Sequence, residues 1–294
     1  MKKLLFTGSA VAIVTPFNSD ESVNFNKLGE LIEFQLKNNT DAIIICGTTG
    51  ESSTLSDEEH REAIKYTVGK VNGRVPVIAG TGSNDTKYAI YLSQYAEEVG
   101  ADAILSVTPY YNKTSQAGLY EHFRQISDSI KIPIILYNVP ARTAININPE
   151  TLLKLSQISN IVAVKECNLG QMIDVAELCG DNLAIYSGND TEILPCLSFG
   201  GKGVISVIAN VIPKDIHDMV SNYLRGNTVE ATNLQLKVNK INRAAFCDVN
   251  PISIKEAMNI MGLGVGPCRM PLVPTIEKNV DLITMNLREY GLIK

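Results

Sequence analysis

Ile161-Val162-Ala163-Val164-Lys165-Glu166 is the stretch of this chain that most limits its fold and its chemistry. A run this short and this rich in β-branched residues predicts a strand buried on both faces, as in a parallel sheet. An ammonium at the end of such a strand loses hydration, so the pKa of Lys165 is expected to fall toward neutrality. A partly deprotonated amine can form a Schiff base with a carbonyl. A salt-bridged or snorkelling lysine would give the same local pattern.

Seven further strand-like runs and a series of helical stretches accompany this strand. The expected strands are Ser9–Thr15, Asp41–Gly47, Val75–Gly80, Asp102–Thr108, Pro133–Val139, Ile161–Glu166, Leu183–Gly188 and Gly203–Ile208. The expected helices between and after them are Asn26–Asn38, Asp57–Val71, Asp85–Val99, Ser115–Ser129, Pro149–Ser159, Gly170–Cys179, Asp190–Leu197 and Pro213–Leu224. Alternating units predict parallel strands joined by crossover helices. Eight units in succession, without a nucleotide-binding glycine motif, favour an α/β fold of the (β/α)8 TIM-barrel type over an open sheet.

The remaining residues form a helical C-terminal region. Helices are expected near Val229–Ala245, Ile252–Met261 and Ile276–Tyr290, broken by Asn250-Pro251 and by the stretch from Gly262 to Pro274. Apolar positions recur at helical spacing on both sides of these breaks, so the breaks are turns. We therefore expect a barrel domain over residues 1–225 and a helical appendage packed on it over residues 226–294.

Composition excludes several classes of protein. The chain has 294 residues and a net charge of −5, and no basic run indicates nucleic-acid binding. No apolar run approaches the ~20 residues that span a bilayer, and Gly8 interrupts the signal-like N-terminus. The six cysteines show no CxxC spacing and are expected to be small buried hydrophobes. His60, His122 and His217 are expected to be surface or capping residues rather than metal ligands. These features predict a soluble, cytoplasmic protein without a metal site.

Polar side chains follow the carboxyl ends of five expected strands, where barrel enzymes carry their active sites. They are Thr48-Thr49-Gly50-Glu51-Ser52, Thr108-Pro109-Tyr110-Tyr111, Tyr137 with Asn138 and Arg142, Lys165, and Ser187-Gly188-Asn189-Asp190. Taken singly, these residues are also typical of a capping turn, of core or interface aromatics, or of a surface ion pair. Taken together, they favour a site. A phenol bonded to hydroxyls can move the protons of Schiff-base chemistry, and turn N–H groups or an arginine can hold a keto acid's carboxylate.

Five motifs in order resemble the dihydrodipicolinate synthase family of pyruvate-dependent, Schiff-base-forming enzymes. They are Gly47-Thr48-Thr49-Gly50-Glu51-Ser52, Thr108-Pro109-Tyr110-Tyr111, the stretch from Tyr137 to Thr143, Val164-Lys165-Glu166, and the stretch from Gly203 to Val207. The resemblance implies a lyase of lysine and diaminopimelate biosynthesis that condenses pyruvate with L-aspartate-4-semialdehyde to 4-hydroxytetrahydrodipicolinate. It also implies a homotetramer built as a dimer of dimers. No cofactor is expected, because the lysine itself supplies the electron sink.

The resemblance assigns roles to eight residues. Lys165 would form the Schiff base, and Tyr137 would be the proton shuttle, linked through Thr48 to a Tyr111 that completes a neighbouring subunit's site. Thr49 would hold the pyruvate carboxylate, and Arg142 would bind the carboxylate of the aldehyde at the mouth of the site. Gly188 and Ile205 would line the pocket through their backbone carbonyls.

Some members of the family are inhibited by lysine bound at a dimer interface. The matching positions here are Ser52, Ser53, Asp57, His60, Asn84, Tyr88 and Tyr110. Sensitive bacterial members carry a histidine in place of Asp57 and a glutamate in place of Tyr88. Losing that glutamate removes an anion suited to a ligand's ammonium, although Asp57 could supply another. We therefore expect little lysine inhibition.

Two other functions remain open from the sequence. The chain could be another pyruvate aldolase, acting on sialic acid or sugar keto acids, but relatives of that type usually lack an arginine matching Arg142. It could also be a catalytically silent barrel that binds a keto acid or an amino acid. That reading predicts a substitution at Lys165, Tyr137 or Thr48, and all three are intact.

Overall fold

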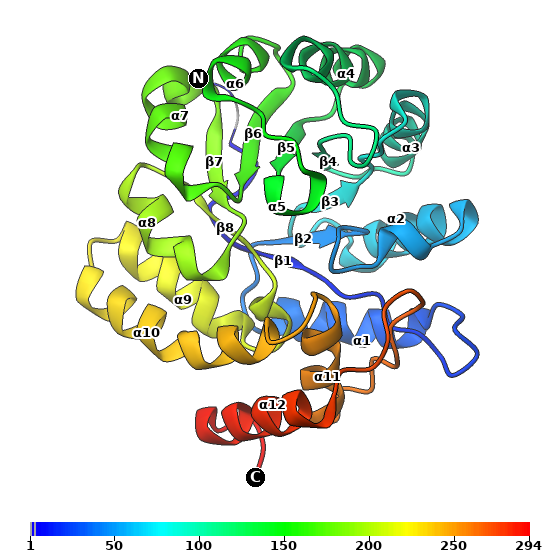
Figure 1. Cartoon of the computed structure of the whole chain (residues 1–294), viewed down its shortest axis with the longest axis vertical. Coiled ribbons are helices and arrows are strands. Elements are labelled where there is room, and N and C mark those ends of the chain that lie inside the picture. The colour runs from blue at the N-terminus through cyan, green and yellow to red at the C-terminus, as the bar shows by residue number, and fades with distance from the viewer. Residues whose placement is uncertain (1, 3) are drawn as a thin grey trace.

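The protein is a closed barrel of eight parallel strands surrounded by helices (Figure 1), as the alternating pattern predicts. A computed structural model describes residue 2 and residues 4–294. Each strand pairs with its neighbours in sequence, and β1 closes the barrel against β8. The strands are β1 (Gly8–Ala12), β2 (Ala42–Ile45), β3 (Val77–Gly80), β4 (Ala103–Val107), β5 (Ile134–Asn138), β6 (Ile161–Glu166), β7 (Ala184–Ser187) and β8 (Gly203–Ser206).

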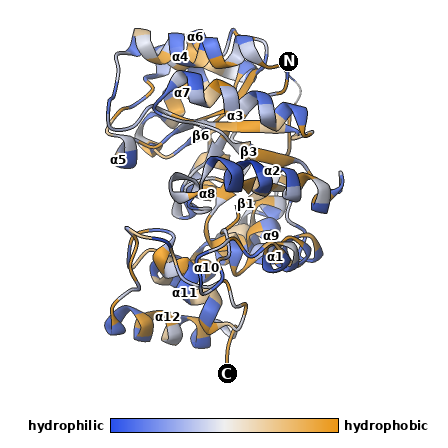
Figure 2. Cartoon of the chain, turned by 90° about the vertical axis from the view of Figure 1, so that its right-hand side faces the viewer, coloured by the Kyte–Doolittle hydropathy of each residue, from blue (hydrophilic) through white to orange (hydrophobic). Residues whose placement is uncertain are grey.

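The strands are buried on both faces because they separate two apolar clusters. In β2, Ala42 and Ile44 point into the barrel, and Ile43 and Ile45 point toward the helices. Successive side chains of a strand face opposite sides, so each face needs its own apolar set. Figure 2 accordingly shows apolar strands between helices whose surfaces are mixed.

The helices follow the expected order. They are α1 (Phe25–Lys37), α2 (Asp57–Val71), α3 (Thr86–Glu98), α4 (Gln116–Ser129), α5 (Pro140–Thr143), α6 (Pro149–Leu155), α7 (Met172–Cys179), α8 (Ile193–Ser198), α9 (Pro213–Leu224), α10 (Thr228–Ala245), α11 (Ile252–Ile260) and α12 (Glu277–Tyr290). The N-terminus of α2 carries a capping box between Ser56 and Glu59, which satisfies two free backbone N–H groups. None of the helices in the described part of the chain combines the length and the hydropathy of a membrane-spanning helix.

Several strands are shorter than their apolar runs. The run Ser9–Thr15 was expected to be one strand, but β1 ends at Ala12. Beyond it, the N–H of Val14 donates to the side-chain oxygen of Asn210 at 3.2 Å rather than to a neighbouring strand. Ile13 and Val14 stay buried although they are no longer in the strand. An apolar run therefore predicts which residues are buried, but it does not predict where the hydrogen-bonded strand ends.

The C-terminal helices pack on the barrel. Helix α10 lies against α9 and α12 (Figure 1), and its buried residues Val238 and Ile241 belong to the same apolar cluster as the outer faces of the strands. The segment after α11 also reaches back to the start of the chain, where the N–H of Phe17 donates to the carbonyl of Val265 at 3.0 Å. The barrel and this region thus share one core.

The expectation of surface histidines is wrong for two of the three. His60 and His122 are buried, and the Nδ1 of His122 lies 2.9 Å from the hydroxyl of Thr86 at the start of α3. The Nε2 of His60 lies 2.7 Å from the carbonyl oxygen of Gly80, and burial lowers the pKa of His122 to about 4. His217 alone is partly exposed, and its bond to Asp41 raises its pKa. All six cysteines are free, as expected, and three of them are buried.

Candidate active site

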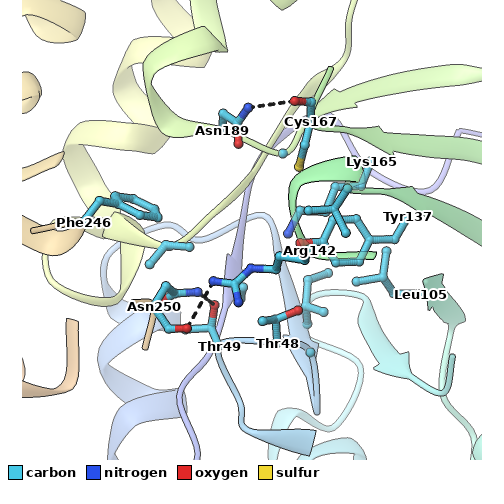
Figure 3. Close-up of a pocket in the computed structure, with 16 residues that line it drawn as sticks. Thr48, Thr49, Leu105, Tyr137, Arg142, Lys165, Cys167, Asn189, Phe246 and Asn250 are labelled. Carbon is cyan, nitrogen blue, oxygen red and sulfur yellow. Dashed lines mark hydrogen bonds between the residues drawn. The ribbon is translucent and has the colours of Figure 1, made fainter. Parts of the chain in front are cut away.

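A cavity of about 70 Å³ lies at the carboxyl ends of the strands. That is room for roughly five water molecules, and hence for a small organic acid. Six of the eight residues with predicted roles line it, and Figure 3 shows most of their side chains converging there. They are Thr48, Thr49, Tyr137, Arg142, Lys165 and Gly188.

Lys165 is the last residue but one of β6, and its side chain lies inside the barrel. It is 5% exposed, and its Nζ lies 4.4 Å from the centre of the Tyr137 ring on the neighbouring strand. Within residues 2 and 4–294, no carboxylate comes within 4.0 Å of this amine. Burial lowers its pKa, and nearby Arg142 acts in the same direction, while Cys167 and Asp190 oppose both. The geometry therefore favours the nucleophile over a salt-bridged or snorkelling lysine.

Glu166, the next residue, points out of the barrel. Its carboxylate accepts hydrogen bonds from Asn138 at 2.9 and 3.0 Å and from the side chain of Gln171 at 2.8 Å. Burial nevertheless raises its pKa to about 7. Because Asn138 follows Tyr137, this network anchors the strand end that carries the phenol.

Tyr137 is buried on β5 with its phenol at the cavity. Burial raises its pKa, and the nearby Arg142 guanidinium and Thr48 hydroxyl oppose that effect. A second, smaller cavity of about 40 Å³ also borders Thr48 and Tyr137, and Ser52 forms part of its wall. The two side chains thus lie between the main cavity and a space large enough for water. A protonated phenol between a hydroxyl and an amine can pass protons in either direction.

The turn after β2 holds Thr49 against the cavity. Thr49 is buried, and its Oγ1 accepts a hydrogen bond from the side-chain amide of Asn250 at 3.0 Å. A Cβ added to Gly50 would lie 3.2 Å from the carbonyl oxygen of Ile13, so this turn approaches β1 closely. The next helix, α2, is capped by Ser56. Capping of α2 therefore does not explain the hydroxyl pair.

Arg142 extends from the short helix α5 to the edge of the cavity. One of its terminal nitrogens, Nη2, donates to the backbone oxygen of Asn250 at 3.2 Å. It forms no ion pair with the part of the chain that the structure describes, so the surface-pair reading is wrong. Its remaining donors are available to a ligand.

Gly188 follows β7 and lines the cavity beside Lys165. A Cβ at this position would lie 2.2 Å from the Sγ of Cys167 and 3.3 Å from the Cε of Lys165. Any side chain would therefore displace the thiol of Cys167 and crowd the lysine. Ile205 is buried inside the barrel but does not reach the cavity wall.

Tyr111 does not reach the cavity of its own chain. Its side chain is 92% exposed, and its φ of 69° is unusual for a residue other than glycine. Tyr110 beside it is also exposed. Neither residue is therefore a core aromatic, and a place at an interface stays a prediction.

Asp57 is the one acidic residue among the positions of the predicted lysine cleft. Its carboxylate pairs with Arg61 at 2.9 Å and accepts hydrogen bonds from the phenols of Tyr88 and Tyr91, each at 3.3 Å. Its charge is therefore already balanced by Arg61. The ring of His60 is engaged with Gly80, as described above. The other four positions, Ser52, Ser53, Asn84 and Tyr110, carry no charge.

Sequence reasoning missed two cavity residues from the C-terminal region. Phe246 follows α10, and Asn250 precedes α11 (Figure 3). In the sequence, Asn250-Pro251 indicated only the end of a helix. The proline was the one available signal that this segment has a fixed geometry.

No three potential ligands among histidine, cysteine and acidic side chains come together as a metal site within the described residues. The cavity instead combines an amine, a phenol, two hydroxyls and a guanidinium. Such a set can form a Schiff base, move protons and hold carboxylates.

Comparison with known proteins agrees with this chemistry. Residues 5–289 match the model of the "Dihydrodipicolinate synthetase family". The 4-hydroxy-tetrahydrodipicolinate synthase of Acetivibrio thermocellus is 58% identical to this chain over 293 residues, which cover 100% of both chains. The crystal structure of dihydrodipicolinate synthase from Aquifex aeolicus has a TM-score of 0.95 at 41% identity and covers 98% of this chain and 99% of that one. The enzyme from Thermotoga maritima has a TM-score of 0.96 at 38% identity, with 99% and 100% covered.

Proposed function

The chain belongs to the dihydrodipicolinate synthetase family, and we propose that it condenses pyruvate with L-aspartate-4-semialdehyde through a Schiff base on Lys165. The products are 4-hydroxytetrahydrodipicolinate and water. The protein is accordingly a lyase of lysine and diaminopimelate biosynthesis. The observation that carries the proposal is the buried Lys165 amine, free of any carboxylate partner in the described chain, 4.4 Å from the Tyr137 ring.

The proposed reaction starts when the neutral amine of Lys165 attacks the keto carbon of pyruvate. The pKa lowered by burial increases the fraction of neutral amine. Loss of water from the adduct gives an iminium, and Tyr137 with Thr48 would supply and remove the protons. The backbone N–H of Thr49 would hold the carboxylate. Loss of a methyl proton then gives an enamine, which attacks the aldehyde.

Arg142 would select the second substrate. Its position at the edge of the cavity supports a contact with the carboxylate of L-aspartate-4-semialdehyde. The aldehyde's amino group then displaces Lys165 from the imine, closes the ring and frees the enzyme. The lysine is regenerated, so the step balances without an oxidant or a further reactant.

Assembly and location are part of the proposal. An exposed Tyr111 supports a dimer in which this residue completes the site of a neighbour, within a homotetramer. We place the enzyme in the cytoplasm, where a biosynthetic enzyme of this kind would meet both substrates.

Replacing Arg142 with alanine is expected to raise the KM for the aldehyde by about ten- to a hundredfold, the scale of one charge-assisted contact. The KM for pyruvate should change far less. The KM of Arg142→Lys for the aldehyde should lie between those of the parent and Arg142→Ala, because lysine keeps the charge but not the planar fork. The measurement is a steady-state assay against L-aspartate-4-semialdehyde, uncharged aldehydes, and sialic and sugar acids. Equal effects on both substrates would show that Arg142 acts structurally, and preferred turnover of a sugar acid would refute the proposed function.

L-Lysine is expected to inhibit the enzyme little or not at all at low-millimolar concentration. An ammonium entering the cleft would have to compete with Arg61 for Asp57, and Tyr88 offers it no charge. The loss of one charge-assisted bond weakens binding by about ten- to a hundredfold. A titration with L-lysine under steady-state conditions checks this. Strong inhibition below the millimolar range would contradict the prediction, and Asp57→Ala would then identify the anion responsible.

A further inference from the structure

Lys255, on the C-terminal helix α11, has its ammonium buried beside the turn that follows β2. Its side chain is 2% exposed. The Nζ donates to Oε1 of Glu51 at 2.8 Å, to the carbonyl of Thr15 at 3.0 Å and to the carbonyl of Pro267 at 2.5 Å. All three donors of the ammonium are thereby used. The amine joins the segment after β1, the turn after β2 and the loop after α11.

Glu51 is held from two sides. Its second carboxylate oxygen accepts the backbone N–H of Arg269 at 2.9 Å. The residue is buried and has a φ of 53°, in the left-handed region that residues other than glycine rarely adopt. A buried charge and a left-handed backbone are both unfavourable, so the surroundings must hold this conformation. The partners that do so come from the C-terminal region.

The constrained residue ends the turn that carries the proposed pyruvate site. The backbone N–H of Glu51 donates to the carbonyl of Thr48 at 3.1 Å. The hydroxyl of Thr15 donates to the carbonyl of Gly50 at 2.6 Å. Thr15, whose carbonyl accepts from Lys255, therefore also binds the residue that follows Thr49. Movement of Glu51 would therefore shift the N–H of Thr49.

We propose that Lys255 and Glu51 are positioning residues of the reaction. Their ion pair holds the turn formed by Thr48, Thr49 and Gly50 so that the N–H of Thr49 meets the carboxylate of pyruvate. The C-terminal region thus sets the geometry of the pyruvate site through a contact between residues 204 positions apart in the chain. The assignment rests on the proposed function, because it takes Thr49 as the carboxylate ligand.

Stability alone does not account for this pair. A buried ion pair adds little net stability compared with apolar residues of the same volume, because both charges lose their hydration. The pair instead fixes the orientation of the groups around it, since each oxygen and each N–H must face its partner. Lys240 and Glu289 form a matched contrast between α10 and α12. Their ion pair has the same length, within 0.1 Å, but it is exposed and remote from the cavity.

The main test is the double variant Glu51→Gln/Lys255→Met, which removes both charges at nearly constant volume. Either single change would leave one buried charge unpaired, so the double variant is the one expected to fold. Circular dichroism and thermal melting establish that it does.

The pyruvate concentration that half-saturates borohydride trapping, and the KM for pyruvate, should rise about ten- to a hundredfold in this variant, the scale of one hydrogen bond to a charged group. At saturating pyruvate, trapping should still reach Lys165, with kcat reduced much less than the KM is raised. Lys240→Met/Glu289→Gln should match the parent in all of these.

A folded double variant with the parent's dependence on pyruvate would overturn the proposal. If the double variant does not fold, Thr15→Val provides the second test, because it removes only the hydroxyl that donates a hydrogen bond to Gly50. Its pyruvate half-saturation should rise roughly two- to tenfold, the scale of a neutral hydrogen bond. An unchanged value in folded Thr15→Val would likewise refute the assignment. Failure of the parent itself to be trapped by pyruvate would instead refute the proposed function.

Discussion

Replacing Lys165 with alanine is expected to remove nearly all condensation activity, leaving only a trace that free amines in solution can supply. The reason is chemical: without the amine no iminium forms, and the other groups in the cavity have nothing to act on. In the parent enzyme, borohydride with pyruvate should add a pyruvyl-derived mass to the peptide that carries Lys165. Trapping should persist near neutral pH, where an ordinary exposed lysine is almost fully protonated, because burial lowers the pKa of this amine.

The matched control is Lys154→Ala, which removes an exposed lysine from α6. This variant should keep the parent's kcat and the same modified peptide. Modification of a different lysine, or undiminished turnover by Lys165→Ala, would mean that the nucleophile lies elsewhere.

The second large effect is expected from Tyr137→Phe, which should lower kcat by about 10²-fold, the usual contribution of one acid–base group. The variant keeps the ring that packs 4.4 Å from the amine of Lys165 and removes only the hydroxyl. The KM for pyruvate should therefore change little. Single-turnover and steady-state kinetics, measured with both substrates, distinguish the two parameters.

Tyr186→Phe is the matched control for the loss of a buried phenol. Its hydroxyl donates to the backbone oxygen of Phe6 at 2.5 Å, away from the cavity. That variant should lose about 1 kcal/mol of stability, the typical net value of a hydrogen bond, while kcat stays near that of the parent. A kcat for Tyr137→Phe within about a factor of two of the parent would exclude the proton shuttle.

The barrel could be predicted because its strands are short, apolar on both faces and separated by helical stretches. Ile161–Glu166 is an example in which the predicted and observed bounds agree. The strand over Ser9–Thr15 was predicted too long, because Ile13 and Val14 remain buried after the ladder ends. Burial can be predicted from an apolar run of residues. The hydrogen bond that Val14 donates to the side chain of Asn210, in place of a strand partner, cannot be predicted from that run.

The cavity residues that lie at strand ends could be predicted from the sequence. Lys165 and Tyr137 are two of them, and they lie on paired strands. Phe246 and Asn250 come from a distant segment, and a contact over 200 positions leaves no periodic pattern in the sequence. The proposed role of Tyr111 involves a second subunit, and periodicity along one chain carries no signal for a contact between subunits.

The wall formed by Phe246 and Asn250 has a consequence for biosynthesis of the enzyme itself. A ribosome adds roughly 5–20 residues per second. All eight strands, which end at Ser206, are made before either residue. The 40 residues from position 207 to position 246 take about 2–8 s at that rate. The whole sheet is therefore synthesised before the wall formed by Phe246 and Asn250, and we expect the amine of Lys165 to be open on that side of the cavity during this interval.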